Sequence, residues 1–250
     1  MAGASSVGAW IRRFHPSPQA TARLVCLPYA GGAAPYYFPL SKALSPTTEV
    51  LAVQYPGRQD RFNEACIEDI ATLADRITDE LIPWTDRPLA LFGHSMGAAV
   101  GFEIALRLEQ RGVKPLGLFA SARRAPSVAG DQRHHLASDE ELVEELVRLN
   151  AANAELLADE SLLPLVLPTI RSDYRASELH QSPSSARLHC PIIALTGEDD
   201  PVVDADGVKD WIRHTSGDFR MRVFPGGHFY LDDHAEAVRQ EITEHIASAA

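Results

Sequence analysis

The sequence predicts one α/β domain built on a mostly parallel, doubly wound sheet. Short apolar segments, largely β-branched or aromatic, alternate with segments of helical period, and this alternation is typical of such sheets. The chain has 250 residues, a length that one domain of this class commonly reaches, so we expect residues 1–250 to form a single domain. The expected strands, each buried on both faces, are residues 23–27, 50–55, 88–92, 116–121, 191–196 and 219–224.

Helical spacing of apolar residues fills two of the gaps between these strands. A helix over residues 98–111 is apolar on nearly all sides, which predicts deep packing, and it stops at Gly112, a residue type favoured just after a helix. The other helix is expected within residues 67–81, where one face carries Ile67, Ile70, Ala71, Ala74, Ile77 and Leu81.

Composition and charge exclude several classes of protein. The formal net charge of -11 argues against a nucleic-acid partner, which would need a basic face. No apolar run is long enough for a membrane span and no signal peptide is recognisable, so we expect a cytoplasmic protein without a membrane partner. Cys26, Cys66 and Cys190 have no metal-ligand spacing, and we expect small buried hydrophobes in a reducing compartment, with no metal and no cofactor.

The pentapeptide Gly93-His94-Ser95-Met96-Gly97 lies between an expected strand and an expected helix. In this setting a G-x-S-x-G motif predicts a nucleophile elbow, a tight turn that holds the Ser95 hydroxyl off the end of a strand. The glycines stand where a Cβ would clash. Chance alone would produce the motif in roughly one chain in ten of this length, so the surrounding sequence must also supply an acid, a base and an oxyanion donor.

Three adjacent acids, Glu198, Asp199 and Asp200, follow the expected strand 191–196. They stand at the carboxyl edge of the sheet, where catalytic groups gather in open α/β folds. We prefer Asp200 to Asp199, because Pro201 fixes a turn directly after it. The alternative is a solvated acidic turn in which an aspartate caps a helix beginning near residue 204.

A histidine follows the last expected strand, in the segment Pro225-Gly226-Gly227-His228-Phe229. The paired glycines allow the loop to bend sharply toward Ser95. His228 completes the order serine, aspartate, histidine that this catalytic arrangement uses along the chain. His234 is the rival, but it stands where the final helix is expected to begin and resembles a surface residue.

Oxyanion donors are expected from the backbone at two places. One is the residue after the nucleophile, Met96, and the other is the glycine-rich turn of residues 28–33, where Ala30 is our candidate. An ordinary turn before a helix would also explain the glycines of this segment.

The segment 123–189 contains no strand pattern but several helical ones. Ser138 and Glu141 form a capping box, and further helix-like stretches cover 151–157 and 162–175, where Pro164 and Pro168 are expected to interrupt the helix. An insertion at this place suits a helical lid over the site. A helical ornament packed on the fold is the alternative.

Five segments together resemble a known family, the type II thioesterases of the α/β-hydrolase superfamily. The resemblance extends over about residues 14–246, and residues 54–58 discriminate best, because generic lipases and esterases have no reason to carry them. The segments are Pro28-Tyr29-Ala30-Gly31-Gly32, Gln54-Tyr55-Pro56-Gly57-Arg58, Gly93-His94-Ser95-Met96-Gly97, Gly197-Glu198-Asp199-Asp200 and Gly226-Gly227-His228-Phe229. Type II thioesterases are free-standing editing hydrolases of polyketide synthases and nonribosomal peptide synthetases, similar to the medium-chain thioesterase of fatty-acid synthesis.

The resemblance implies a serine thioesterase that removes aberrant or stalled acyl groups from the phosphopantetheine arm of a carrier protein. Ser95, Asp200 and His228 would form the catalytic triad, and the partner would be the acyl-loaded carrier protein. We expect the protein itself to be a monomer. The alternative is an oxygen-ester hydrolase of the carboxylesterase or lipase kind. Since carrier proteins are usually acidic, a basic docking patch is expected near the site mouth, and its candidates are Arg58, Arg61, Arg123 and Arg124.

Overall fold

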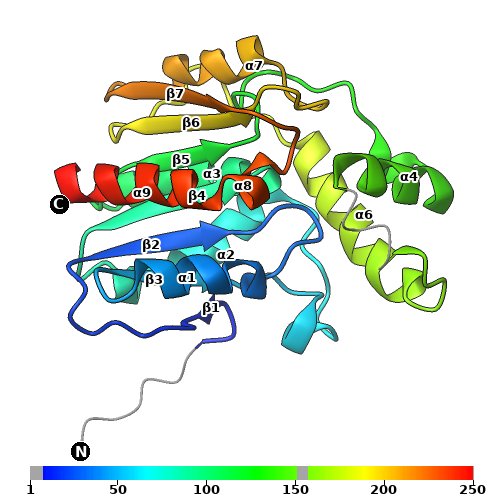
Figure 1. The fold of residues 1–250 in the computed structure, drawn as a ribbon, viewed down its shortest axis with the longest axis horizontal. Coiled ribbons are helices and arrows are strands. Elements are labelled where there is room, and N and C mark those ends of the chain that lie inside the picture. Colours follow the sequence, from blue (N-terminus) through cyan, green and yellow to red (C-terminus); the bar gives the residue numbers. More distant parts are fainter. Residues whose placement is uncertain (1–7, 151–156, 250) are drawn as a thin grey trace, which may run out of the picture.

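The computed structural model describes residues 8–150 and 157–249, and it places one sheet between two layers of helices (Figure 1). The sheet has the order β1-β3-β2-β4-β5-β6-β7, with β1 antiparallel to β3 and every other described pair parallel. The strands are β1 (Ile11–Arg12), β2 (Ala22–Leu27), β3 (Thr48–Val53), β4 (Leu89–His94), β5 (Leu118–Ser121), β6 (Ile192–Gly197) and β7 (Phe219–Phe224).

All six predicted strands are present, so the doubly wound α/β prediction is confirmed, and the described residues also contain the short strand β1. The expectation that every strand is buried on both faces is wrong for β7, in which Arg220, Arg222 and Val223 are exposed. The reason is position: β7 is the last strand in the sheet order and therefore has a neighbour on one side.

The strand order places a topological switch in the middle of the sheet. The chain leaves β2 toward β3 on one side, whereas it leaves the neighbouring β4 toward β5 on the other side. Loops that diverge in this way open a crevice at the carboxyl ends of the two strands, and ligands of open α/β folds bind there.

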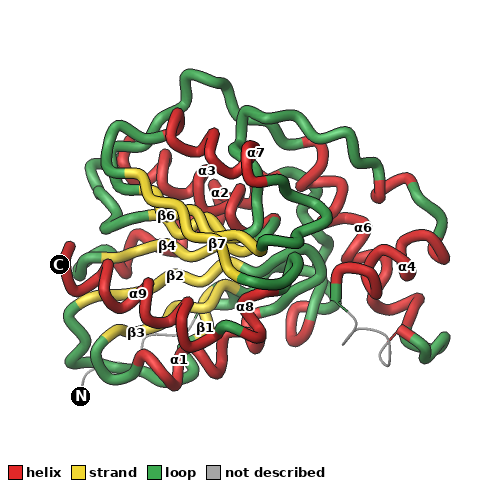
Figure 2. Tube along the Cα trace, turned by 45° about the horizontal axis from the view of Figure 1, so that its top comes forward, coloured by secondary structure: helices red, strands yellow, loops and turns green. Residues whose placement is uncertain are grey.

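Helices cover both faces of the sheet, and the two layers are seen best in Figure 2. One layer holds α2 (Ile70–Leu81), α3 (Met96–Gln110) and α7 (Ala205–Lys209), which share a buried apolar cluster with the sheet. The opposite layer holds α1 (Phe38–Leu44), α8 (Tyr230–Asp233) and α9 (Ala235–Ala249), which pack on the other face. The buried core thus lies on both faces of the sheet.

The two predicted core helices are present with shifted starts. Helix α2 begins at Ile70, because the Asp69 carboxylate caps it by accepting a hydrogen bond of 2.7 Å from Thr72 N–H. Helix α3 begins directly after Ser95 and ends before Gly112, which has the positive φ of 79° that favours glycine.

Helices α4 (Asp139–Leu149) and α6 (Leu163–Leu179) lie beside the carboxyl edge of the sheet, between β5 and β6 in the chain (Figure 1). The capping box predicted for α4 is confirmed, since Ser138 Oγ accepts from Glu141 N–H while the Glu141 carboxylate accepts from Ser138 N–H. Residues 151–156 of the predicted stretch 151–157 lie outside the described residues.

The predicted interruption by prolines is wrong, because α6 runs through both of them. Pro164 stands in the first turn, where a backbone N–H has no helical partner in any case. Pro168 removes one helical hydrogen bond, and the helix continues beyond it because its inner face packs on the core, with Leu167, Thr169, Ser172 and Asp173 all buried.

Two expectations drawn from composition concern the thiols and the length of apolar helices. Cys26 and Cys190 are buried free thiols as expected, whereas Cys66 is only half-buried. In the part of the chain that the structure describes, no helix combines the length and the apolar character that crossing a membrane requires.

Candidate active site

Ser95 lies at the junction of β4 and α3 in a backbone conformation that non-glycine residues rarely adopt, with φ 54° and ψ -117°. The junction is tight because both flanking glycines are in backbone contact. A Cβ on Gly93 would collide with the carbonyl oxygen of Gly97, and a Cβ on Gly97 would collide with that of Leu27. Ser95 N–H donates to Ser121 O at 2.8 Å, which ties the turn to β5.

The loops after β6 and β7 bring an acid and a base together. Asp200 Oδ2 accepts a hydrogen bond of 2.8 Å from His228 Nδ1, and both side chains are almost fully buried, at 0% and 3% exposed. Asp200 Oδ1 accepts from the N–H groups of Val202 and Val203 at 2.8 and 3.2 Å. With the carboxylate held on both oxygens, the proton of a neutral His228 stays on Nδ1, and Nε2 is left as the basic nitrogen.

Glycine allows these two loops to approach. A Cβ on Gly197 would collide with the carbonyl oxygen of Gly227, and Gly226 has a φ of 103°. The rival residues lie elsewhere: the exposed Asp199 binds the β7 loop through its backbone, with N–H to Gly226 O at 2.9 Å, and the ring of His234 lies 5.9 Å from that of Phe224.

The glycine-rich segment after β2 forms a hydrogen-bonded turn over residues 29–32. Gly32 N–H donates to Tyr29 O at 2.9 Å, and Gly31 has a φ of 77°, as the third position of a type II turn requires. Within the described residues no acceptor binds the Ala30 N–H, and Ala30 lines the cavity described below. Met96 N–H belongs to the first turn of α3, where backbone donors have no partner within the helix.

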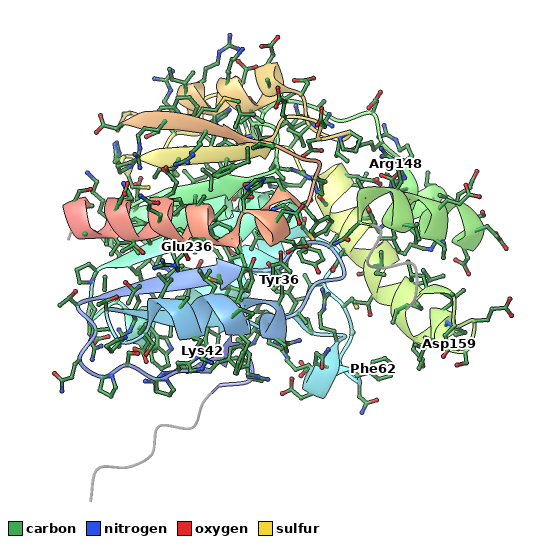
Figure 3. All side chains as sticks on the ribbon, viewed as in Figure 1. Tyr36, Lys42, Phe62, Arg148, Asp159 and Glu236 are labelled. Carbon is green, nitrogen blue, oxygen red and sulfur yellow. The ribbon has the colours of Figure 1, made fainter. Side chains whose placement is uncertain are left out.

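A cavity of about 380 Å³ lies at the switch point, between the sheet edge and the helices α4 and α6, and Ser95, His228 and Ala30 line it. Its volume lies within the usual range for small-molecule sites. Phe62 and Leu165 also line it and are about half exposed, at 49% and 50%, so the cavity reaches the surface beside them; Figure 3 shows Phe62. Other apolar lining residues are Leu146, Leu149, Leu157, Val166 and Ile170.

Polar groups line the part of the cavity near the end of α6. The guanidinium of Arg123 donates to Ser177 Oγ and Ser177 O at 2.7 and 2.9 Å, and burial lowers its pKa to about 10. The carboxylate of Glu178 accepts from the His134 N–H at 2.8 Å and contacts the His135 ring. Among the described residues, no group of three or more His, Cys, Asp or Glu side chains is arranged to hold a metal ion.

The prediction of a basic docking patch is wrong for Arg58 and Arg61. Both are buried, at 7% and 5% exposed, and both are engaged inside the protein. Arg61 donates to Gln54 O and pairs with Glu64. Arg123 lines the cavity, and Arg124 donates to Val202 O at 2.9 Å. An arginine in a loop at a strand end is as able to bind carbonyl oxygens of its own fold as it is to face a partner, and sequence reasoning missed this.

His94, the second residue of the elbow motif, is fully buried behind the site. Its Nδ1 lies 2.9 Å from Ser121 Oγ, which lies 2.7 Å from the Tyr230 hydroxyl, and its ring centroid is 5.2 Å from that of His228. Burial, together with the neighbouring His228, lowers the pKa of His94 well below its ordinary value. A neutral imidazole at this position places no second positive charge beside the His228 ring.

Sequence reasoning also missed Asp173 of α6, which is 3% exposed and paired with Arg58. No local signal marks it, since an acid in an amphipathic helix usually faces solvent. The unusual segment 54–58 was the available signal, because a buried arginine requires a partner.

Comparison with known proteins identifies the family of the chain. The family model described as a thioesterase domain matches residues 22–247. The "Probable cadicidin biosynthesis thioesterase" of Streptomyces griseus is 49% identical over 235 residues, which are 94% of this chain and 65% of that protein. The chain thus spans slightly less than two thirds of that relative. "Thioesterase PikA5" of Streptomyces venezuelae is 49% identical over 241 residues, which are 96% of this chain and 86% of that protein.

Among solved structures, the type II thioesterase BorB from the borrelidin biosynthetic cluster superimposes with a TM-score of 0.88 at 47% identity, over 94% of this chain and 97% of that chain. The sheet order and the loops at its carboxyl edge define an α/β-hydrolase. Within this class the chain belongs to the thioesterase family, and the resemblance to type II thioesterases is confirmed.

The elbow glycine makes a stability prediction possible. Gly97→Ala should lower the free energy of unfolding by more than about 3 kcal/mol, because its Cβ meets the backbone oxygen of Leu27, which cannot move aside. Gly101→Ala in the same helix is the matched control, since its Cβ would meet the methyl ends of Leu118 and Leu27, at 2.9 and 3.1 Å. Urea unfolding measures both, and equal losses would contradict the close approach at the elbow.

The buried histidines predict a loss of stability on acidification. His94, His214 and His245 have pKa values lowered by burial, so below about pH 6.5 the unfolded chain binds protons that the folded protein does not bind. Stability should therefore fall as the pH drops from 6.5 toward 5, by up to about 1.4 kcal/mol per pH unit for His94 and by less for the other two. His94→Gln should show a shallower slope in urea unfolding across this range, and an unchanged slope would refute the assignment to His94.

Proposed function

We propose that this protein hydrolyses acyl thioesters on the phosphopantetheine arm of carrier proteins, and so removes aberrant or stalled acyl groups from a polyketide or nonribosomal peptide synthase. One observation carries the proposal: His228, which is hydrogen-bonded to Asp200, lines the same cavity as Ser95. Ser95 itself lies in a strained turn. Membership of the thioesterase family supports the choice of a thioester, and the names of relatives from antibiotic pathways support the carrier-bound substrate.

In the proposed mechanism His228 Nε2 takes the proton of the Ser95 hydroxyl, and Ser95 Oγ attacks the thioester carbonyl. The N–H groups of Ala30 and Met96 bind the oxyanion, while Asp200 holds the ring orientation and stabilises the imidazolium. When the tetrahedral intermediate collapses, the C–S bond breaks, and the sulfur leaves as a thiol after receiving the proton from His228. A thiol with a pKa near 8.5 is a good leaving group, so this step depends little on acid assistance.

The second half of the cycle uses the same groups. His228 takes a proton from water, the resulting hydroxide attacks the acyl-Ser95 ester, and the Ala30 and Met96 N–H groups again bind the oxyanion. Collapse of this intermediate returns the proton to Ser95 Oγ and releases the carboxylic acid. Both tetrahedral intermediates therefore depend on the same two backbone donors.

Helices α4 and α6 form a cap over the cavity, and this cap fits the same proposal. Residues 123–189 supply α4 and α6 above the sheet edge, and we assign them as a lid within a single domain of residues 1–250. Helices α4 and α6 would shield the bound acyl chain from bulk water. We also propose that the protein is cytoplasmic, since its free cysteines suit a reducing compartment. We further propose that it acts as a monomer.

Replacing the nucleophile tests the assignment directly. Ser95→Ala should lower kcat for acyl-carrier thioesters by at least about 10⁴-fold, because no covalent intermediate can form. The circular dichroism spectrum and melting temperature should match those of the parent protein. A folded Ser95→Ala variant with substantial turnover would remove Ser95 from the mechanism.

The acid can be tested with a matched neighbour. Asp200→Asn keeps an oxygen for the Val202 and Val203 N–H groups but presents an amide donor to His228 Nδ1, which selects the wrong tautomer. We expect kcat to fall by about 10⁴-fold. Asp199→Asn, at an exposed side chain, should leave kcat within about twofold. Comparable losses in both variants would show that the acid is misassigned.

The leaving group is tested by a substrate panel. The parent protein should have a higher kcat/KM for acyl groups on carrier protein, and for matched small thioesters, than for oxygen esters of the same acyl chain. The reason is the better leaving group together with a cavity shaped for a carried acyl chain. Preference for the oxygen esters would favour a carboxylesterase instead.

A further inference from the structure

The segment 54–58 ends in an arginine that has no part in the proposed chemistry. The Arg58 guanidinium is 7% exposed and binds the carboxylate of Asp173 through two hydrogen bonds, Nη1 to Oδ2 at 2.6 Å and Nη2 to Oδ1 at 2.8 Å. Asp173 belongs to α6, so this bidentate pair joins the core of the fold to the cap.

Both partners of the pair also hold the turn that presents Ala30. Asp173 Oδ2 accepts a hydrogen bond of 2.7 Å from Gly31 N–H, and Arg58 Nη1 donates to Gly32 O at 3.2 Å. These bonds fix the positions of Gly31 and Gly32, the two residues that directly follow Ala30.

Gln54, the first residue of the same segment, extends this hold. Its Oε1 accepts from Ala34 N–H at 3.0 Å, and its Nε2 donates to Arg58 O at 3.3 Å. The backbone from residue 31 to residue 34 is thus bonded at three places by the segment 54–58 and α6.

The face of α6 that carries Asp173 also packs against these loops. Ile170 occupies the space beside Gly31, where a Cβ would come within 2.7 Å of Ile170 Cγ1. One residue earlier, Thr169 Oγ1 donates to Gly57 O at 2.9 Å. Residues 169, 170 and 173 of α6 therefore contact the turn and the segment 54–58 together.

We propose that Arg58 and Asp173 are positioning residues for the oxyanion hole, which is formed only when α6 is seated on the core. The inference rests on the proposed function, since it assigns a role to the Ala30 N–H in thioester hydrolysis. If α6 moved away, Gly31 would lose its acceptor, and Arg58 would be left as an unpaired charge in a buried place, which is strongly unfavourable. The oxyanion hole is therefore complete only while the cap is closed.

The size of the effect follows from the tolerance of such sites. Donors must be held within about 0.5 Å of the oxyanion position to act fully. Complete loss of one donor costs about 10²–10³-fold in kcat, so a displaced Ala30 should cost about 10- to 100-fold.

The test uses two conservative variants of the pair. Arg58→Lys retains the charge but loses the two-pronged geometry, and Asp173→Asn retains an oxygen for Gly31 but faces Arg58 with an amide donor. For both we expect kcat on an acyl thioester to fall by about 10- to 100-fold while KM changes less than about threefold. Binding of an alkylboronic acid, whose serine adduct carries an oxyanion-like hydroxyl, should weaken by a similar factor.

Arg23→Lys is the control, because Arg23 is also a buried arginine paired with a buried carboxylate, that of Glu49, and it lies at the opposite edge of the sheet, away from the cavity. It should lower the melting temperature as much as Arg58→Lys does but leave kcat and boronate binding unchanged. If the three variants lose stability alike and all keep the parent kcat, or if only KM rises, the positioning role is overturned.

A measurement on the unaltered protein gives an answer even if the variants fail to fold. In hydrogen exchange the Gly31 amide should be protected nearly as strongly as amides of the central strands, because its acceptor is the buried Asp173 carboxylate. Exchange as fast as in exposed loops would overturn the proposal. Absence of any thioester hydrolysis by the parent protein would instead overturn the proposed function, and the Gly31 result would still report on the turn.

Discussion

The site depends first on how closely the backbone of the elbow approaches the end of β2. Gly97 lies against the carbonyl oxygen of Leu27, and Gly93 lies against Gly97, in spaces that no Cβ can enter. This contact fixes the left-handed backbone of Ser95, and it places the first turn of α3 beside the turn that follows β2. Because β2 and β4 are neighbours whose connections diverge, the same contact sets the two loops on either side of the crevice at the switch point.

A second constraint, the Arg58–Asp173 pair, joins what the elbow cannot reach. The elbow determines where the nucleophile lies, but the turn at residues 29–32 could still adopt other conformations with its two glycines. Asp173 and Arg58 bond to that turn, and Gln54 binds Ala34 just beyond it. The cap and the turn thus share the same buried charges. The segment 54–58 therefore performs a structural task next to the candidate catalytic centre.

Much of the fold could be predicted because its signals are local. The strands and the helices α2 and α3 have the expected apolar patterns, and the capping box of α4 is readable in four residues. The errors arose where packing outweighed a local preference. Pro168 remains inside α6 because the inner face of the helix is buried, and β7 is partly exposed because it ends the sheet. Arg58 and Arg61 resembled surface charges, and only their buried partners show otherwise.

The sequence by itself determined the order and chemistry of the site: a serine between glycines, an aspartate and a histidine after successive strands, and a glycine-rich turn after the first long strand. These follow from chain order and residue type, which parallel sheets convert into neighbours at one edge. The tertiary structure alone decided between Asp200 and Asp199 as the partner of His228, and it revealed Asp173 as the partner of Arg58. The physical reason is that carboxylates are chemically equal along the chain, and only the folded backbone determines which one is buried against a particular donor.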